Sequence, residues 1–374
     1  MSLKSPSWNE IRSTLDRPLG LITGALFSLG MVALLSASTG VYKANYSFPI
    51  RQALWGMVGF AGYIWVIKVG YRRILEMSER IYGASLLLLF LVLVMGHTAK
   101  GAQSWFNLGP VRLQPSELGK LALGVFMARH LCRFPPEDLR SIGMALGLSG
   151  LSLALLMLQP DLGSALVYCA MIGAGLWAAG IGSRYMGGLV TLGLMALPVA
   201  WGFLKPYQRM RLLVFIDPKV DPLGAGYNVI QSRIAVGSGG LFGKGFMGGT
   251  QGRLHFLPEP HTDFIFSVFA EEFGFVGGVA AVLLFVALIW RIFQIAFEAR
   301  DLRAKVLCSM LGAWMFFQTF ESIAMSMGLA PVTGLPLPLF SYGGSSLVAE
   351  MLALGLVQSV AVESRRERFD LPGS

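Results

Sequence analysis

The chain has 374 residues, of which 54% are hydrophobic and only 14% are charged, and its mean hydropathy is +0.62. Because soluble domains carry about 25% charged residues, this composition excludes an ordinary soluble protein and indicates an integral membrane protein. The formal net charge of +9 at pH 7 reflects basic loops beside membrane spans. We therefore predict no nucleic-acid partner.

Segments of about 20 apolar residues are typical of helices that span a bilayer. We predict an all-α polytopic membrane protein, with a single domain over residues 1–374 and apolar faces in contact with membrane lipids. The ten predicted spans are residues 18–38, 49–70, 79–96, 116–132, 139–158, 162–180, 185–204, 263–292, 303–327 and 345–362.

The distribution of lysine and arginine predicts how the chain crosses the membrane. An even number of spans leaves both termini on one side. If that side is the cytoplasm, the short outer loops keep few basic residues, namely Lys43, Arg51, Lys100 and Arg112. Since basic residues concentrate in cytoplasmic loops, we predict that both termini are cytoplasmic.

The longest polar segment, residues 205–262, lies between the seventh and eighth predicted spans. Its backbone could not be paired in lipid, so we predict a large extracytoplasmic loop. Basic and apolar residues alternate over 205–215, which favours a short helix at the membrane interface, and 228–236 is compatible with a second short helix. Loops on a rigid scaffold often carry binding and catalysis, so we expect function here.

A glycine-rich run, residues 237–245, lies within this loop. It departs from the nucleotide-binding pattern, because Ser238 stands where glycine is needed and Gly245 where serine or threonine is needed. We therefore predict no nucleotide cofactor. Two roles stay open: the glycines let the chain turn sharply, or the amides of the run meet a pyrophosphate.

Several ionisable residues lie within predicted spans, where charge is costly and marks candidate functional sites. Glu117 and Lys120 share one helix face within pairing reach, so they form either a structural ion pair or a grip on a polar headgroup. Asp161 lies at the outer end of the sixth span. For three further acids we favour structural pairing: Glu272, Glu321 and Glu350.

Asp263 opens the eighth predicted span. A helix N-terminus favours an ionised carboxylate, and Asp is also a common helix cap, so a capping role is one interpretation. Glu259, His261, Lys244 and Arg253 are expected on the same outer surface, which favours a reactive role as general base or cation ligand. A zinc site matches no standard template among the donors His255, Glu259, His261 and Asp263.

In order along the chain, these segments resemble the SEDS family of bacterial cell-wall polymerases (shape, elongation, division and sporulation proteins). The resemblance covers essentially the whole chain. The final motif, Pro-Leu-Pro-Leu-Phe-Ser-Tyr, is more similar to the elongation branch of the family than to its division branch. The matching stretches are residues 100–109, 114–120, 159–163, 237–245, 249–251, 256–266, 271–272 and 334–346.

The resemblance implies a peptidoglycan glycosyltransferase of the bacterial cytoplasmic membrane. Such an enzyme polymerises lipid II, the undecaprenyl-pyrophosphate-linked disaccharide-pentapeptide, into glycan strands for elongation and rod shape. A class B penicillin-binding protein, a membrane-anchored transpeptidase, is the implied partner. Asp263 falls on the essential acid of the family, and Glu117, Lys120 and Asp161 fall on polar positions of its central cavity.

The implied chemistry agrees with the residues. The donor carries its own leaving group, and a divalent cation such as Mg²⁺ or Mn²⁺ at Asp263, or basic groups and amides, could stabilise the charge that develops. Attack on an α-linked donor to give a β-linkage is an inversion, for which one carboxylate activates the incoming hydroxyl. We predict further substrate-binding residues at Arg112, Lys244, His261 and Ser341.

The alternative function is a flippase that transports lipid II across the membrane. Cavity-facing acids and glycine-rich segments suit a carrier as well. Against it, the two halves of the chain show no internal repeat of the kind that many carriers have. The candidate residues also crowd one face of the membrane, which favours an enzyme that works on the outer side.

Overall fold

The computed structural model describes residues 8–39, 45–99, 102–109, 111–254 and 256–369. Within them, seven helices are long and apolar enough to cross a membrane: α2 (Arg17–Ala37), α3 (Ser47–Val69), α5 (Ser78–Met95), α7 (Leu139–Leu158), α12 (Ile265–Glu298), α13 (Leu302–Met327) and α14 (Gly344–Phe369). The other predicted spans also form helices, α6 (Pro115–Arg133), α8 (Leu162–Ala178) and α9 (Ser183–Phe203). The multi-pass helical fold is confirmed.

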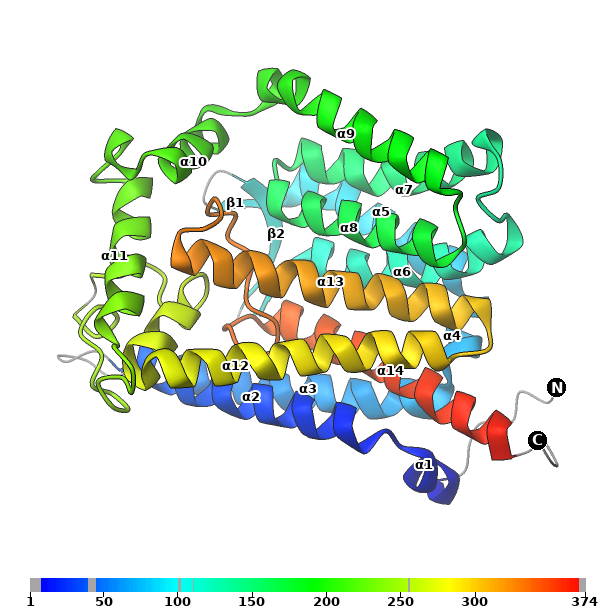
Figure 1. Ribbon diagram of the computed structural model, residues 1–374, viewed down its shortest axis with the longest axis horizontal. Helices are drawn as coiled ribbons and strands as arrows, with labels where there is room; N and C mark the ends of the chain where they lie inside the picture. The colour runs from blue at the N-terminus through cyan, green and yellow to red at the C-terminus, as the bar shows by residue number, and fades with distance from the viewer. Residues whose placement is uncertain (1–7, 40–44, 100–101, 110, 255, 370–374) are drawn as a thin grey trace.

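The helices α13 and α14 form the centre of the bundle and are the most buried of the spanning helices. α14 packs along α3, and α13 contacts α6, α8 and α12. By contrast, α9 runs across the outside of the bundle, and most of its described side chains are exposed (Figure 1). Its exposed apolar residues are those expected of a helix that faces lipid.

The bundle has two distinct ends. α1 (Trp8–Thr14) and the last turns of α14 lie together at one end, where Arg366 pairs with Glu10 at 2.9 Å (Figure 1). The two predicted short helices of the insert, α10 (Pro206–Ile216) and α11 (Ala225–Ser238), lie at the opposite end and are confirmed. The connections also contain α4 (Tyr71–Glu76) and a short 3-10 helix, Pro218–Val220.

An Asp16 clasp, made by Asp16, Arg291 and Arg365, joins three helices near the end that carries α1. Asp16 caps α2 by accepting a hydrogen bond from the Leu19 amide at 3.1 Å, and it is fully buried. Arg291 of α12 reaches it at 2.5 Å, and Arg365 of α14 also pairs with it. Burial alone raises the pKa of Asp16, but the hydrogen bonds and charges of these partners lower it below its usual value.

The loop between α5 and α6 contains a small antiparallel sheet that the sequence did not lead us to expect. Its order is β1 (His97–Ala99), β2 (Ala102–Leu108) and β3 (Val111–Leu113). Gly109 has a φ of 72°, which suits the tight reversal between β2 and β3. The sheet places Arg112 opposite Asn107.

The eighth span differs from the prediction that one helix begins at residue 263. α12 begins at Ile265 and is broken at Gly274, whose φ of 66° and ψ of −165° lie outside the helical region. The break separates a short helix, residues 265–273, from a span over 275–298. Glu271 and Glu272 therefore belong to the short helix before the break and not to the long span.

A glycine loop, residues 237–249, wraps around this break. The Phe275 amide donates to the Gly240 carbonyl at 2.8 Å. In return, the Lys244 amide donates to the Glu271 carbonyl at 3.1 Å. Glycine is required for this close approach, since a Cβ on Gly243 would lie 2.0 Å from the backbone of Glu272. These contacts favour the turn-forming role over the pyrophosphate role.

We expect the Gly274→Ala variant to be destabilised by about 1–3 kcal/mol, because this backbone conformation is nearly exclusive to glycine. An added Cβ would also lie 2.2 Å from the Gly243 nitrogen. Thermal unfolding of the detergent-purified protein measures the effect. The matched control is Gly278→Ala on the same helix, where a Cβ would meet its nearest neighbour, Phe266, at 3.8 Å. Equal stability of the two variants would contradict the structural role of the break.

Candidate active site

Asp263 lies at the end of the bundle that carries α10 and α11, shortly before α12. The cap position of that helix is occupied by Phe264, which makes no side-chain cap hydrogen bond. Asp263 therefore lies one residue before the cap position that the helix-cap interpretation gave it. Its carboxylate is half-buried and faces a pocket instead.

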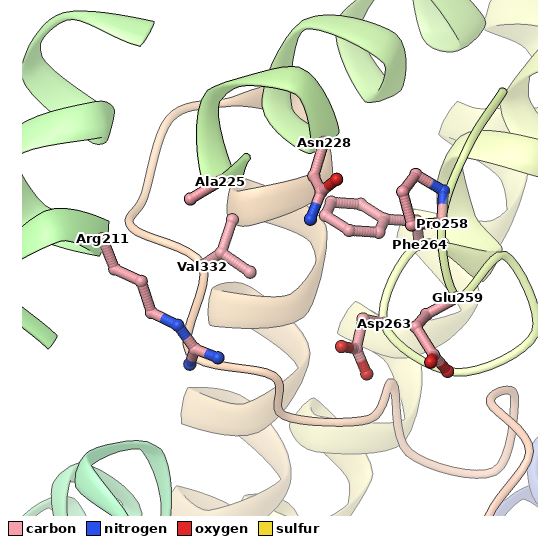
Figure 2. Close-up of a pocket in the computed structure, with 8 residues that line it drawn as sticks. All are labelled: Arg211, Ala225, Asn228, Pro258, Glu259, Asp263, Phe264 and Val332. Carbon is pink, nitrogen blue, oxygen red and sulfur yellow. The ribbon is translucent and has the colours of Figure 1, made fainter. Parts of the chain in front are cut away.

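The pocket has a volume of about 260 Å³. Figure 2 shows the carboxylates of Asp263 and Glu259 on one side and the guanidinium of Arg211 reaching in from the other. Acidic and basic groups thus face one another across a space that admits a small polar group. The lining residues are Arg211, Ala225, Asn228, Pro258, Glu259, Asp263, Phe264 and Val332.

Ser341 fixes the backbone next to Asp263. Its hydroxyl donates to the Thr262 carbonyl at 2.7 Å and accepts from the Leu337 amide at 2.8 Å. Ser341 is buried, with 5% exposure. In this structure the predicted substrate-binding residue therefore supports Asp263 from the loop between α13 and α14.

His261 also belongs to the support of the site. Its ring stacks on Phe48 with 4.3 Å between centroids and meets Tyr342 edge-on at 6.0 Å. The Tyr342 amide donates to the His261 carbonyl at 2.9 Å. One imidazole nitrogen lies 3.9 Å from a carboxylate oxygen of Glu259, which does line the pocket. His261 thus links the pocket to α3.

The structure does not place Lys244 or Arg112 in the pocket. Lys244 pairs with Glu271 at 2.6 Å, and Glu271 is fully buried. Its charge therefore secures the glycine loop against the short helix. Arg112 is exposed on β3 and is not among the residues that line the pocket.

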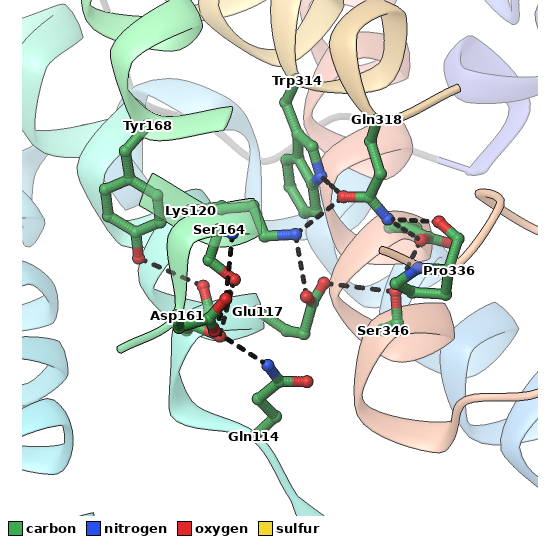
Figure 3. A network of polar contacts seen from close by, with 12 residues as sticks. Gln114, Glu117, Lys120, Asp161, Ser164, Tyr168, Trp314, Gln318, Pro336 and Ser346 are labelled. Carbon is green, nitrogen blue, oxygen red and sulfur yellow. Dashed lines mark hydrogen bonds and ion pairs between the residues drawn. The ribbon is translucent and has the colours of Figure 1, made fainter. Parts of the chain in front are cut away.

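Glu117 and Lys120 form the ion pair that their spacing predicts, at 2.8 Å. Both side chains are almost completely buried, with 1% and 0% exposure. Lys120 also donates to Gln318 at 2.7 Å, and its ammonium lies 4.9 Å from the centre of the Trp314 ring. Figure 3 shows these groups converging between α6 and α13. In this conformation the buried Glu117–Lys120 pair, here called the strut, joins α6 to α13 and is not accessible to a substrate.

The strut continues into α14 through Ser346, whose hydroxyl contacts Glu117 at 3.2 Å and Glu350 at 2.7 Å. Glu350 in turn accepts from the Leu339 amide at 2.8 Å. Gln318 donates to the Pro336 carbonyl at 2.9 Å. These bonds support the structural interpretation of Glu350 and tie the helices to the loop that carries Ser341.

Asp161 caps α8. Its carboxylate accepts from the amide of Ser164 at 3.0 Å and from the hydroxyl of Ser164 at 2.7 Å. Gln114 approaches it at 3.3 Å (Figure 3). The preceding carbonyl, that of Pro160, accepts from Tyr207 of α10 at 3.0 Å. Asp161 therefore lies next to Pro160, the residue that anchors α10, and it does not line the Asp263 pocket.

Sequence analysis missed the two other polar residues of the pocket lining, Arg211 and Asn228. Both fell within the predicted short helices of the insert, but the alternation of basic and apolar residues did not distinguish Arg211 from Lys205 or Arg209. Only the placement of α10 across from Asp263 identifies Arg211 as the arginine that lines the pocket.

The pocket offers limited ligands for a metal ion. Within the described ranges, no three His, Cys, Asp or Glu side chains gather in a metal-binding arrangement, and His255 lies outside those ranges. Glu259 and Asp263 line the same pocket. Two carboxylates suit Mg²⁺, which is commonly bound by one or two carboxylates together with substrate phosphates.

Fold and site together define a multi-pass membrane protein with a polar pocket beyond one end of its helical bundle. The family that contains FtsW, RodA and SpoVE, described as "Cell cycle protein", matches residues 17–366. The chain belongs to this family.

Two curated relatives align over nearly the full length. The chain is 44% identical to peptidoglycan glycosyltransferase MrdB of Escherichia coli (strain K12), over 96% of this chain and 95% of that protein. It is 36% identical to stage V sporulation protein E of Bacillus subtilis (strain 168), over 94% of this chain and 98% of that protein.

Two solved structures share the fold. One is the rod shape determining protein RodA of Thermus thermophilus, with a TM-score of 0.72, 33% identity, and coverage of 96% of this chain and 98% of that chain. The other is a chain from a peptidoglycan synthase complex that coordinates polymerization and crosslinking. It has a TM-score of 0.81, 37% identity, and coverage of 96% of this chain and 99% of that chain.

We expect Lys120→Met to lower stability by about 3–5 kcal/mol, because it leaves Glu117 buried without its counter-charge. The double variant Glu117→Gln/Lys120→Met removes both charges and should recover most of that stability. Thermal unfolding of the purified variants measures both effects. A single variant as stable as the wild type would contradict the strut. If the double variant is stable but inactive, the pair also serves the substrate.

Proposed function

We propose that this protein is a peptidoglycan glycosyltransferase that polymerises lipid II into glycan strands. The observation that carries the proposal is the half-buried carboxylate of Asp263, which faces Arg211 across one pocket at the outer end of the bundle. The names of two relatives, "Peptidoglycan glycosyltransferase MrdB" and "Probable peptidoglycan glycosyltransferase FtsW", support it. The higher identity to MrdB and the likeness to a rod shape determining protein favour a role in elongation.

The proposed setting is the bacterial cytoplasmic membrane, with both termini in the cytoplasm. α1 and the end of α14 share one end of the bundle, and the pocket lies beyond the other. Together with the sparse basic residues of the short loops at the pocket end, this arrangement supports a pocket on the outer face. Lipid II presents its sugars and diphosphate on that face after transport.

The proposed reaction forms one bond and breaks another at the anomeric carbon of the donor sugar. The hydroxyl oxygen of the acceptor attacks that carbon as its bond to the lipid diphosphate oxygen breaks. Asp263 takes the proton of the hydroxyl, and the diphosphate leaves with the bonding electrons. A single basic carboxylate is what inversion requires. The Ser341–Thr262 bond holds the backbone before this carboxylate in place.

A divalent cation fits the donor set of the pocket. Asp263 and Glu259 would hold it from the protein side, and the substrate diphosphate would complete its oxygen ligands. When bound, such an ion would offset the negative charge of the leaving diphosphate.

A class B penicillin-binding protein is the proposed partner. The solved structure with the TM-score of 0.81 comes from a complex that coordinates polymerization with crosslinking. A glycan polymerase without a transpeptidase leaves its strands unlinked, so a membrane-anchored crosslinking enzyme is the chemistry that this product requires.

We expect Asp263→Ala to reduce polymerisation of lipid II by 10²-fold or more, the range for loss of a general base. Asp263→Asn should fail similarly, since it keeps the shape but not the basicity. The assay is gel separation of glycan made by the purified full-length protein from labelled lipid II in detergent. Thermal unfolding is the control for folding. Normal polymer from the folded Ala variant would refute the role of Asp263.

The same assay distinguishes the flippase alternative. Lipid II dissolved in detergent requires no transport, so polymer formed under these conditions identifies an enzyme. A wild-type protein that makes no polymer alone or with the transpeptidase, yet moves labelled lipid II across vesicles, would favour the carrier.

We expect EDTA to suppress polymerisation and added Mg²⁺ or Mn²⁺ to restore it. Glu259→Gln should raise the Mg²⁺ concentration needed for half-maximal rate, because it removes one of the two carboxylates of the pocket. Titration of the rate with Mg²⁺ measures the shift, and Glu10→Gln at the far end of the bundle is the control. A rate unaffected by EDTA would contradict the cation.

A further inference from the structure

We propose that Arg211 forms the diphosphate subsite of the pocket and that Thr333 and Glu321 position it. The proposal rests on the proposed function, and it replaces Lys244 and Arg112 as the expected anion-binding groups. A donor lipid would then lie with its diphosphate against Arg211 and its reacting sugar toward Asp263.

Charge and shape favour Arg211 for this role. It is the basic residue in the pocket lining, and it reaches in opposite Asp263 and Glu259 (Figure 2). A guanidinium presents parallel N–H groups that match phosphate oxygens, and it stays charged at any physiological pH. Without a bound cation the carboxylates on the other wall would repel a diphosphate, and with one the diphosphate would bridge the cation and Arg211, so Arg211 contacts the anion in either case.

Arg211 keeps hydrogen-bonding capacity. Its Nη1 donates to the Thr333 carbonyl at 3.2 Å, and its guanidinium lies 5.7 Å from the centre of the Tyr207 ring. Among the described residues, that carbonyl is the one hydrogen-bond acceptor of the guanidinium. The N–H groups on Nε and Nη2 therefore remain for oxygen atoms of a ligand in the pocket.

Two lysines that the sequence singled out as candidates are engaged in other ion pairs. Lys120 is enclosed in the Glu117 strut, and Lys244 is paired with buried Glu271. A diphosphate would have to break those pairs to use either charge, at the cost of leaving a buried carboxylate alone. Arg211 could bind a diphosphate without breaking an ion pair of this kind.

Thr333 and Glu321 explain why Arg211 points into the pocket. The Thr333 hydroxyl donates to the carboxyl of Glu321, while its backbone carbonyl accepts from Arg211. Glu321 lies on α13 with 5% exposure, and its second oxygen is buried without a hydrogen-bond partner. It is also close enough to Arg211 and Asp263 to interact with both electrostatically. Glu321 is thus a positioning residue that acts through Thr333.

The helix that carries Arg211 is anchored independently. Tyr207 and Gln208 both donate to the Pro160 carbonyl, at 3.0 and 3.2 Å. Arg209 lies two positions away on α10 but donates to the Gly202 carbonyl at 2.9 Å and does not line the pocket. Arg209 therefore provides a matched control for the loss of one arginine from the same helix.

The test measures binding of farnesyl diphosphate and farnesyl monophosphate to the full-length detergent-purified protein. All binding variants are made in an Asp263→Ala background, called the parent, because a protein without the proposed base can bind the ligand without turning over substrate. We expect Arg211→Ala in that background to weaken farnesyl diphosphate binding by about tenfold or more, the loss expected for charge-assisted hydrogen bonds. Arg211→Lys should weaken farnesyl diphosphate binding less than Arg211→Ala does. Arg211→Ala should weaken binding of farnesyl monophosphate less than binding of the diphosphate. Arg209→Ala should leave binding of both ligands unchanged.

The positioning role has its own variants. Thr333→Val keeps the backbone carbonyl but loses the hydroxyl bond to Glu321, so we expect severalfold weaker binding of the diphosphate. Thr333→Ser should restore the affinity of the parent. In the otherwise wild-type enzyme, Thr333→Val should raise the KM for lipid II more than it lowers kcat. Unchanged binding in Thr333→Val, or no rescue by serine, would refute the positioning role.

The outcomes separate this proposal from the proposed function. Parent-like diphosphate binding by the folded Arg211→Ala variant would overturn the subsite, even if that variant polymerised poorly. Equal losses in the Arg211→Ala and Arg209→Ala variants would also overturn it, because they would indicate a general charge effect. A wild-type protein that binds the diphosphate through Arg211 but makes no polymer would refute the polymerase and leave the subsite standing.

Discussion

The position of Asp263 depends on how the backbone is paired where α12 breaks at Gly274. A break in a helix frees amide and carbonyl groups, and each is costly to leave unpaired near lipid. The glycine loop satisfies them in both directions, with carbonyls that accept from the start of the span and amides that donate to the short helix. The short helix, and with it Asp263, is therefore fixed to the loop from one side, while Ser341 holds the preceding residue from the other.

Charges within the bundle and charges in the pocket have different roles. The Glu117–Lys120 pair and Glu350 are buried and hydrogen-bonded, so they join α6, α13 and α14 into a rigid centre. Asp263 and Arg211 line the pocket at the end that carries α10 and α11. The loop between α13 and α14 connects the two regions, because Pro336 accepts from the strut and Thr333 accepts from Arg211. Rigidity at the centre is thereby passed to the residues of the site.

Hydropathy and composition predicted the spans because lipid imposes a local requirement on every residue of a span. Asp263 was likewise predictable, from its position in the sequence and from family resemblance. The break at Gly274 was not, because the apolar pattern runs through it and its cause is a loop distant along the chain. The assignments of Lys244 and Arg211 were missed for a related reason. Long-range packing draws Lys244 to Glu271 and turns Arg211, but not Arg209, toward Asp263.

The Asp16 clasp imposes an order on biosynthesis. Asp16 is translated with the first span, whereas its partners Arg291 and Arg365 belong to helices that are translated near the end. Until those helices insert, the carboxylate lacks both arginines and is stabilised by the Leu19 amide of its own helix and by water. A nascent chain therefore lacks the complete Asp16 clasp until α14, its final helix, is in place. Premature termination before Arg365 would leave Asp16 with Arg291 as its one arginine partner among the described residues.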